Sequence, residues 1–266
     1  MNAQLTENSL RETADAAYAC CIRWFGPPTD PETKYDIFFG PHSLCVFSGW
    51  IRRYLIQIYP SSSIAEVTRS IGHEMCHRVT TKRKGLHKEV WVSEMLAFLA
   101  EQWFLHDCSL GEHADSLVQT LFDYEDRVPI SQLKSTKRNT GIIARLHGNF
   151  YPPDFRQHTA RLGTALAQIV GREPMAQMVE ARDLQDWIAK LPPYHGAIVS
   201  RVLGEPDLRA FPADASHLRC YGYACTLLGD VERAALSYRQ ALALCPSDGN
   251  AKRGLEYALE RLLELP

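Results

Sequence analysis

The sequence predicts a mostly helical α+β protein, with a small sheet near its start and helices through the rest of the chain. Two short segments, residues 35–39 and 53–59, are rich in β-branched and aromatic side chains and end at Gly40 and Pro60, as strands do. From residue 63 onward, apolar residues recur at spacings of three and four, which is the period of a helix. The 266 residues can hold one large core or two modest domains.

The first helices are predicted from their apolar faces and end signals. A leading helix is expected over residues 8–25, because its apolar residues share one face: Leu10, Ala14, Ala17, Tyr18 and Cys21. A second helix is expected from Ser63, since Ser followed three residues later by Glu66 is a helix-capping pattern. Its core-facing stripe consists of Ile64, Val67, Ile71 and Met75. It is expected to end near Thr80, before the basic run of residues 82–84, which is expected to be a solvated connection.

The most informative stretch lies inside this second helix, where residues 73–77 read His-Glu-Met-Cys-His. Two histidines four residues apart on a helix project from the same face, one turn apart. His73 and His77 can therefore bind one Zn²⁺, with Glu74 beside the water that the metal holds. Zinc lowers the pKa of such a water to about 7, and a glutamate can then take a proton from it. The stretch predicts a zinc hydrolase; the structural alternative is an amphipathic helix with a few polar residues.

The next segment, residues 91–101, is strongly apolar and contains no helix breaker. Glu94 and Glu101 are seven residues apart on it, so they share a face. A carboxylate on so apolar a helix costs several kcal/mol to bury unless it is paired or bound to a metal. The segment therefore predicts a carboxylate ligand that completes the metal site; the alternative places both glutamates on the surface.

These residues resemble the gluzincins, the clan of thermolysin and of the aminopeptidase N family. Sixteen residues separate His77 from Glu94, and residues 91–97 read W-V-S-E-M-L-A, in the order of the aminopeptidase N pattern W-L-N-E-G-F-A. A further glutamate, Glu101, stands four residues after the alanine, as in that family. The resemblance implies that His73, His77 and Glu94 bind zinc, that Glu74 is the general base, and that Glu101 orients a ligand or a basic neighbour. It also implies a small sheet whose edge strand is available to an extended substrate.

Two features refine the expected activity. The aminopeptidases carry a G-x-M-E-N segment that recognises the substrate's free amine, and the chain has no such segment between Tyr35 and Ser63. A peptide or protein substrate is therefore expected, cleaved by an endopeptidase or by a hydrolase of one narrow substrate. The family also uses a downstream tyrosine to stabilise the oxyanion. Tyr151 is the first candidate for this role, and the alternatives are His158, Tyr194 and His195.

The C-terminal segment resembles one tetratricopeptide repeat. The residues that carry this resemblance are Leu218, Tyr221, Gly222, Cys225, Gly229, Ala234, Tyr238, Ala241 and Pro246. Its small residues let two antiparallel helices approach closely, and a capping helix is expected over residues 249–263. One repeat cannot bury its own apolar face, since about three are normally needed. The hairpin is therefore expected to pack on the preceding helices, and it serves structure, a protein partner, or both.

Three parts are thus expected: a gluzincin-like core over residues 1–110, a helical region over 111–205 that completes the active-site cleft, and the repeat with its capping helix over 206–266. Two other classes of function fit the same residues. A two-histidine, one-carboxylate set also holds iron, which would make the protein a tailoring oxygenase. Alternatively, the zinc is structural, and the chain is a non-catalytic scaffold that binds a partner through the repeat.

Composition adds expectations about partners and location. The net charge of −2 gives no electrostatic case for nucleic acid or membrane partners. No apolar run of 18 residues indicates a membrane span, and the first eight residues do not resemble a signal peptide. The eight cysteines lack C-x-x-C spacing, which favours free thiols and a cytoplasmic location. Cys76, inside the zinc motif, points about 100° away from His77 and is expected to be a small buried side chain.

Overall fold

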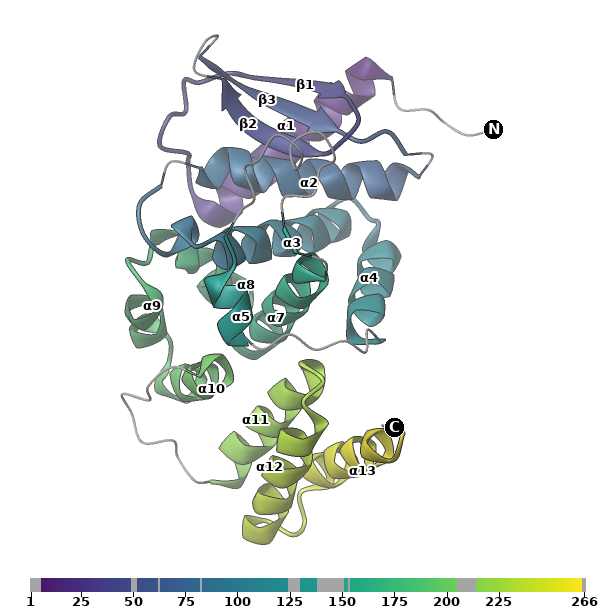
Figure 1. The fold of residues 1–266 in the computed structure, drawn as a ribbon, viewed down its shortest axis with the longest axis vertical. Helices are drawn as coiled ribbons and strands as arrows, with labels where there is room; N and C mark the ends of the chain where they lie inside the picture. The colour runs from purple at the N-terminus through teal and green to yellow at the C-terminus, as the bar shows by residue number, and fades with distance from the viewer. Residues whose placement is uncertain are drawn as a thin grey trace.

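The computed structural model describes residues 6–48, 52–61, 63–81, 83–123, 130–137, 151–152, 154–204 and 214–264. Within these residues, twelve α-helices and one three-stranded sheet form a mostly helical α+β fold, as the sequence predicted. Figure 1 shows the sheet at one end of the molecule and the last three helices at the other end. None of the described helices is both long enough and apolar enough to cross a membrane.

The sheet follows the first helix and contains one strand that the sequence did not predict. Helix α1 (Glu7–Phe25) leads into β1 (Tyr35–Phe39), β2 (Leu44–Ser48) and β3 (Arg53–Ile58). The strand order is β1-β3-β2, with β3 parallel to β1 and antiparallel to β2. Strands β1 and β3 were expected. Strand β2 was missed because none of its described side chains is buried, so its sequence lacks the alternation of a buried face.

Two helices form the centre of the molecule. Helix α2 (Ile64–Thr80) is followed by the short 3₁₀ helix η1 (Leu86–Lys88) and by α3 (Val90–Asp107). The Ser63 side chain caps α2 by accepting a hydrogen bond from the N–H of Glu66, as the sequence predicted. Both helices lie under the sheet and α1 in Figure 1, and 14 of the 18 residues of α3 are buried.

Gly72 allows α2 and α3 to pack closely. A Cβ atom at this position would lie 3.2 Å from the Cβ of Phe104 and 3.4 Å from the carbonyl oxygen of Ala100, so the two helices leave little room for a side chain here. The connection between the helices is also fixed in place. Arg83 is not solvated, contrary to expectation, because its guanidinium donates to the carbonyl oxygens of Gly26 and Pro27 at 2.9 and 2.7 Å.

The middle of the chain is helical, as expected. Its elements are α4 (Gly111–Asp123), α5 (Ile130–Ser135), α7 (Phe155–Val170), α8 (Arg172–Ala176), the 3₁₀ helix η2 (Gln177–Glu180), α9 (Leu184–Lys190) and α10 (Pro193–Leu203). Helix α7 lies directly against α3. A Cβ atom at Gly163 would lie 2.5 Å from Cγ of Met95, so the close contact of these helices depends on a glycine there.

The last three helices are α11 (Ala215–Leu227), α12 (Val231–Leu244) and α13 (Gly249–Leu263). Helices α11 and α12 form the expected hairpin (Figure 1), and the ring of Tyr238 lies against Gly222 and Gly254. The hairpin packs on the preceding helices, since Nε of Arg161 on α7 donates to the carbonyl oxygen of Leu227 at 2.7 Å. Its packing agrees with the expectation that one repeat needs neighbours.

Candidate metal centre

The structure brings three side chains of the predicted metal site together between α2 and α3. The Nε2 atoms of His73 and His77 are 3.1 Å apart. The two carboxylate oxygens of Glu94 each lie 3.4 Å from one of these nitrogens. His73 and Glu94 are buried, while the side chain of His77 keeps 17% of its surface exposed. The cluster is therefore held rigidly by the helices and open to solvent on one side.

The separations of these atoms fit a tetrahedral metal ion. Ligand atoms bound at about 2.0–2.1 Å to a tetrahedral zinc lie about 3.3–3.4 Å from one another. The two Nε2 atoms, 3.1 Å apart, are close to that value, and each lies 3.4 Å from a different oxygen of Glu94. With one oxygen taken from Glu94, all three donor atoms lie within 4.8 Å of one another, so the set can close around one ion. Two histidines and one glutamate also form the ligand set of catalytic zinc sites that keep a fourth position for water or substrate.

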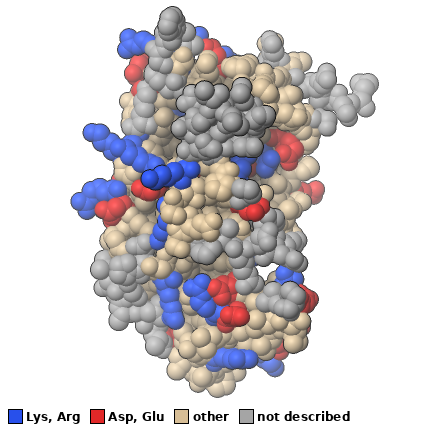
Figure 2. Space-filling model, in the orientation of Figure 1, with Lys and Arg blue, Asp and Glu red and all other residues tan. Residues whose placement is uncertain are grey.

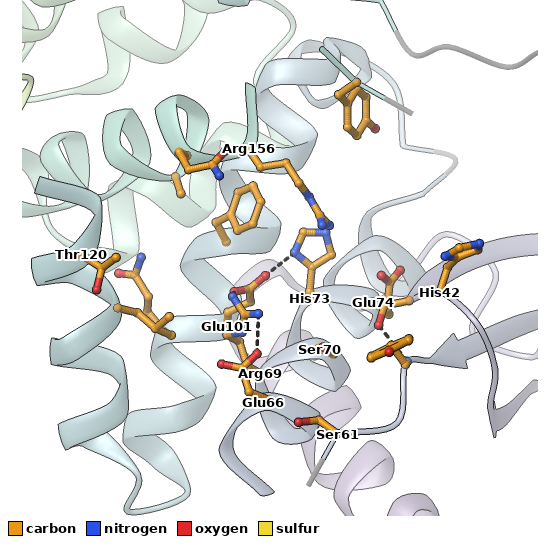
Figure 3. A pocket seen from close by; sticks show the side chains of 18 of the residues that line it. His42, Ser61, Glu66, Arg69, Ser70, His73, Glu74, Glu101, Thr120 and Arg156 are labelled. Carbon is orange, nitrogen blue, oxygen red and sulfur yellow. Dashed lines mark hydrogen bonds and ion pairs between the residues drawn. The ribbon is translucent and has the colours of Figure 1, made fainter. Parts of the chain in front are cut away.

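Glu101 contacts His73, and Arg69 contacts Glu101 in turn; Figure 3 shows these three side chains at the cleft. One carboxylate oxygen of Glu101 lies 2.7 Å from Nδ1 of His73, and the other lies 3.5 Å from Nη1 of Arg69. A proton on Nδ1 leaves the lone pair of Nε2 for the metal, so Glu101 selects the tautomer that can bind it. Oγ of Ser93 lies 3.4 Å from Nδ1 of His77 and occupies the corresponding position there.

The electrostatics of the cluster favour positive charge between the glutamates. Burial lowers the pKa of His73, but hydrogen bonds to Glu101 and Glu94 outweigh it and raise this pKa to about 10. Burial would raise the pKa of Glu94, but the neighbouring histidines hold it well below its usual value. Glu74, Glu94 and Glu101 are all buried in this small volume. Buried carboxylates need compensating charge, which a divalent cation supplies.

A cleft of about 720 Å³ opens beside this cluster and is lined by Glu74 and Tyr151. Glu74 is only 3% exposed, and burial raises its pKa. The Tyr151 hydroxyl donates to a carboxylate oxygen of Glu94 at 2.7 Å. Of the four candidates for oxyanion stabilisation, Tyr151 is the one among the described cleft-lining residues. His158 lies on α7, and Tyr194 and His195 lie on α10.

The other cleft walls contain residues that sequence reasoning did not single out. The cleft extends from His42 and Ser43, next to the edge strand β2, to Arg156 at the start of α7. Arg69 carried a signal that could have identified it, because it lies four residues before His73 and hence on the same helix face. Arg156 carried none, since its position depends on how α7 packs against α3. Cys76 is fully buried, and burial raises its pKa, which agrees with a small core side chain.

Comparisons of the chain with family models, with curated proteins and with solved structures found no match. The chemistry of the site is therefore inferred from its geometry. Figure 2 adds that Lys and Arg side chains lie among Asp and Glu side chains on the face it shows, within the described residues.

Proposed function

We propose that the protein is a zinc-dependent hydrolase that cleaves a peptide (amide) bond, with a gluzincin-like site. The observation that carries the proposal is the cluster of His73, His77 and Glu94, whose donor atoms lie within 4.8 Å of one another, beside a cleft that Glu74 lines. Zinc bound there would polarise the scissile carbonyl and lower the pKa of a bound water to about 7.

The residues of the chain have separate roles in this proposal. His73, His77 and Glu94 hold the metal, and Glu101 keeps the Nε2 lone pair of His73 available to it. Glu74 follows a metal ligand directly in the sequence and lines the cleft. It takes the proton of the attacking water and passes it to the leaving amine, as a general base and then a general acid.

Tyr151 has two roles that experiment can separate. Its hydroxyl reaches Glu94 at 2.7 Å and also lines the cleft, so it either positions the ligand or donates to the oxyanion. Tyr151→Phe should lower kcat with zinc retained if the hydroxyl serves the oxyanion. Lower zinc affinity with kcat retained at saturating zinc would indicate the positioning role instead.

The shape of the cleft supports an endopeptidase or a narrow-substrate hydrolase. The cleft reaches His42 and Ser43, immediately before β2 at the edge of the sheet. An extended peptide can add to such an edge as a further strand, with its main chain hydrogen-bonded on both sides of the scissile bond. A cytoplasmic location agrees with the eight cysteines, all of them described and none in a disulfide.

The proposal is tested by metal analysis and a peptide library. Glu74→Gln should retain zinc and lose about 10²–10⁴-fold in turnover, because the side chain keeps its size and loses its basicity. Glu66→Gln is the matched control, since Glu66 lines the same cleft but forms an ion pair with Arg69 instead of facing the donor atoms.

Three results would favour a different function or mechanism. Iron in the purified protein, with oxygen-dependent turnover, would make it a tailoring oxygenase. Full turnover by zinc-loaded Glu74→Gln would remove the general base from the mechanism. Absence of cleavage by the parent protein on the whole library, with no effect of Glu74→Gln on partner binding, would indicate a scaffold.

A further inference from the structure

Among the described residues, two arginines line the cleft, and they differ in their partners. Arg69 pairs with Glu66 at 2.7 Å and with Glu101 at 3.5 Å, so its charge is already balanced. Arg156, in the first turn of α7, forms no ion pair with any residue that the structure describes. The residue is exposed to solvent, so the N–H donors of its guanidinium are available to a ligand in the cleft.

The ring of Phe98 contacts both Arg156 and the candidate metal ligand His73. Its guanidinium carbon lies 5.7 Å from the centre of the Phe98 ring, and that ring packs edge-to-face against His73 at 5.0 Å. Figure 3 shows the Arg156 side chain extending toward His73. Burial raises the pKa of Glu74, and the charge of Arg156 is among the effects that lower it, which agrees with this proximity.

We propose that Arg156 binds a carboxylate of the substrate. Because a single ring, that of Phe98, bridges Arg156 and His73, this carboxylate must lie within about three residues of the scissile bond, at about 3.3–3.6 Å per extended residue. A planar guanidinium matches a carboxylate with two parallel hydrogen bonds. Glu74 and Asp154 line the same cleft, and their negative charge opposes a doubly charged phosphate more than a carboxylate. This inference rests on the proposed peptidase function and narrows its substrates to peptides with a free C-terminus or an acidic side chain near the cleaved bond.

The two sources of the carboxylate are separated by three forms of one cleaved peptide. The first has a free C-terminus and a glutamate near the scissile bond, the second is amidated at the C-terminus, and the third has glutamine in place of the glutamate. Poor cleavage of the amidated form shows that Arg156 binds the C-terminal carboxylate. Poor cleavage of the glutamine form shows that it binds the glutamate side chain. Equal cleavage of all three forms overturns the inference and leaves the hydrolase proposal intact.

Variants of Arg156 test the contact itself. Arg156→Gln should lower kcat/KM by about 10- to 100-fold for the preferred form, mainly by raising KM, because the contact is made in ground state and transition state alike. Arg156→Lys should restore part of this loss. Arg182→Gln is the control, since Arg182 has an 83% exposed side chain and is not among the described residues that line the cleft. An unchanged KM in Arg156→Gln overturns the inference.

A binding experiment separates this inference from the proposed function. Zinc-loaded Glu74→Gln is mixed with a peptide pool, and retained peptides are identified by mass spectrometry. Retention of carboxylate-bearing peptides by Glu74→Gln, and its loss in Glu74→Gln with Arg156→Gln, supports the inference even if the parent cleaves nothing. Equal retention by the two proteins, preferential retention of phosphopeptides, or no retention at all overturns it.

Discussion

Glu101→Gln is the change that most directly tests how the metal ligands are held. The Glu101 carboxylate faces Nδ1 of His73 at 2.7 Å on one side and Arg69 at 3.5 Å on the other. A glutamine that accepts from Nδ1 turns its NH₂ group toward the guanidinium, where two donors meet. The opposite rotamer turns the NH₂ group toward Nδ1 and forces the proton onto Nε2, the atom that must bind the metal. We therefore expect zinc affinity to fall by about 10- to 100-fold, or about 1.4–2.8 kcal/mol.

The assay is competition with a chelator of known zinc affinity, with circular dichroism to check the fold. Glu66→Gln is the matched control, because Glu66 pairs with the same Arg69 at 2.7 Å but is about half exposed and does not contact His73. Such an exposed pair contributes about 0–1 kcal/mol, so this variant should bind zinc nearly as well as the parent. Glu94→Ala should lose more affinity than Glu101→Gln. Parent-like affinity in Glu101→Gln, or a larger loss there than in Glu94→Ala, would refute the assignment of the two glutamates.

Three further changes test the packing and the pH dependence. Gly163→Val should separate α7 from Met95 on α3 and lower stability by about 1–3 kcal/mol, measured by urea unfolding; an unchanged midpoint would contradict the close contact. Gly222→Leu should cost a similar amount by displacing Tyr238, and loss of partner binding without loss of stability would instead make the hairpin a free recognition module. Burial and nearby positive charge lower the pKa of His87 from 6.5 to about 4, so the unfolded chain binds its proton first. Stability should therefore fall as pH decreases from 6.5 to about 4, by about 1–3 kcal/mol more in the parent than in His87→Gln; parallel pH profiles of the two proteins would refute this.

Most of the fold could be predicted because its signals are local. The cap of α2 at Ser63, its end near Thr80 and the buried positions Val67, Ile71 and Met75 depend on neighbouring residues, and these predictions were confirmed. The prediction was wrong for Ile64, the first residue of the stripe, which is 46% exposed at the start of the helix. Strand β2 and the position of Arg83 were not predicted correctly. Strand β2 has no buried side chain among its described residues, and Arg83 is fixed by carbonyl oxygens of residues 26 and 27, far away in the sequence.

The candidate site shows the same difference between local signals and contacts that are distant in the sequence. Helical spacing indicated that His73 and His77 share one face, and that Glu94 and Glu101 share another. That the two faces form one site was implied by the resemblance to the gluzincins. The other residues that contact the metal ligands or line the cleft lie farther away in the sequence. Arg156 reaches the cleft only because α7 packs on α3, and no spacing in the sequence encodes that contact. The hydroxyl of Tyr151 reaches Glu94 across 57 positions of the sequence, and its choice as a candidate depended on family resemblance.

Helix α7 has contacts at both ends of the molecule, and this affects how the protein unfolds. Its first turn carries Arg156 into the cleft, Gly163 lies against α3, and Arg161 is hydrogen-bonded to the hairpin through the carbonyl oxygen of Leu227. Detaching the hairpin leaves the buried guanidinium of Arg161 without that acceptor. Loss of the hairpin contact therefore destabilises α7, which also contributes to the cleft. The amide protons of α3, α7 and α11 should therefore exchange with solvent in one cooperative event, at a common free energy of opening.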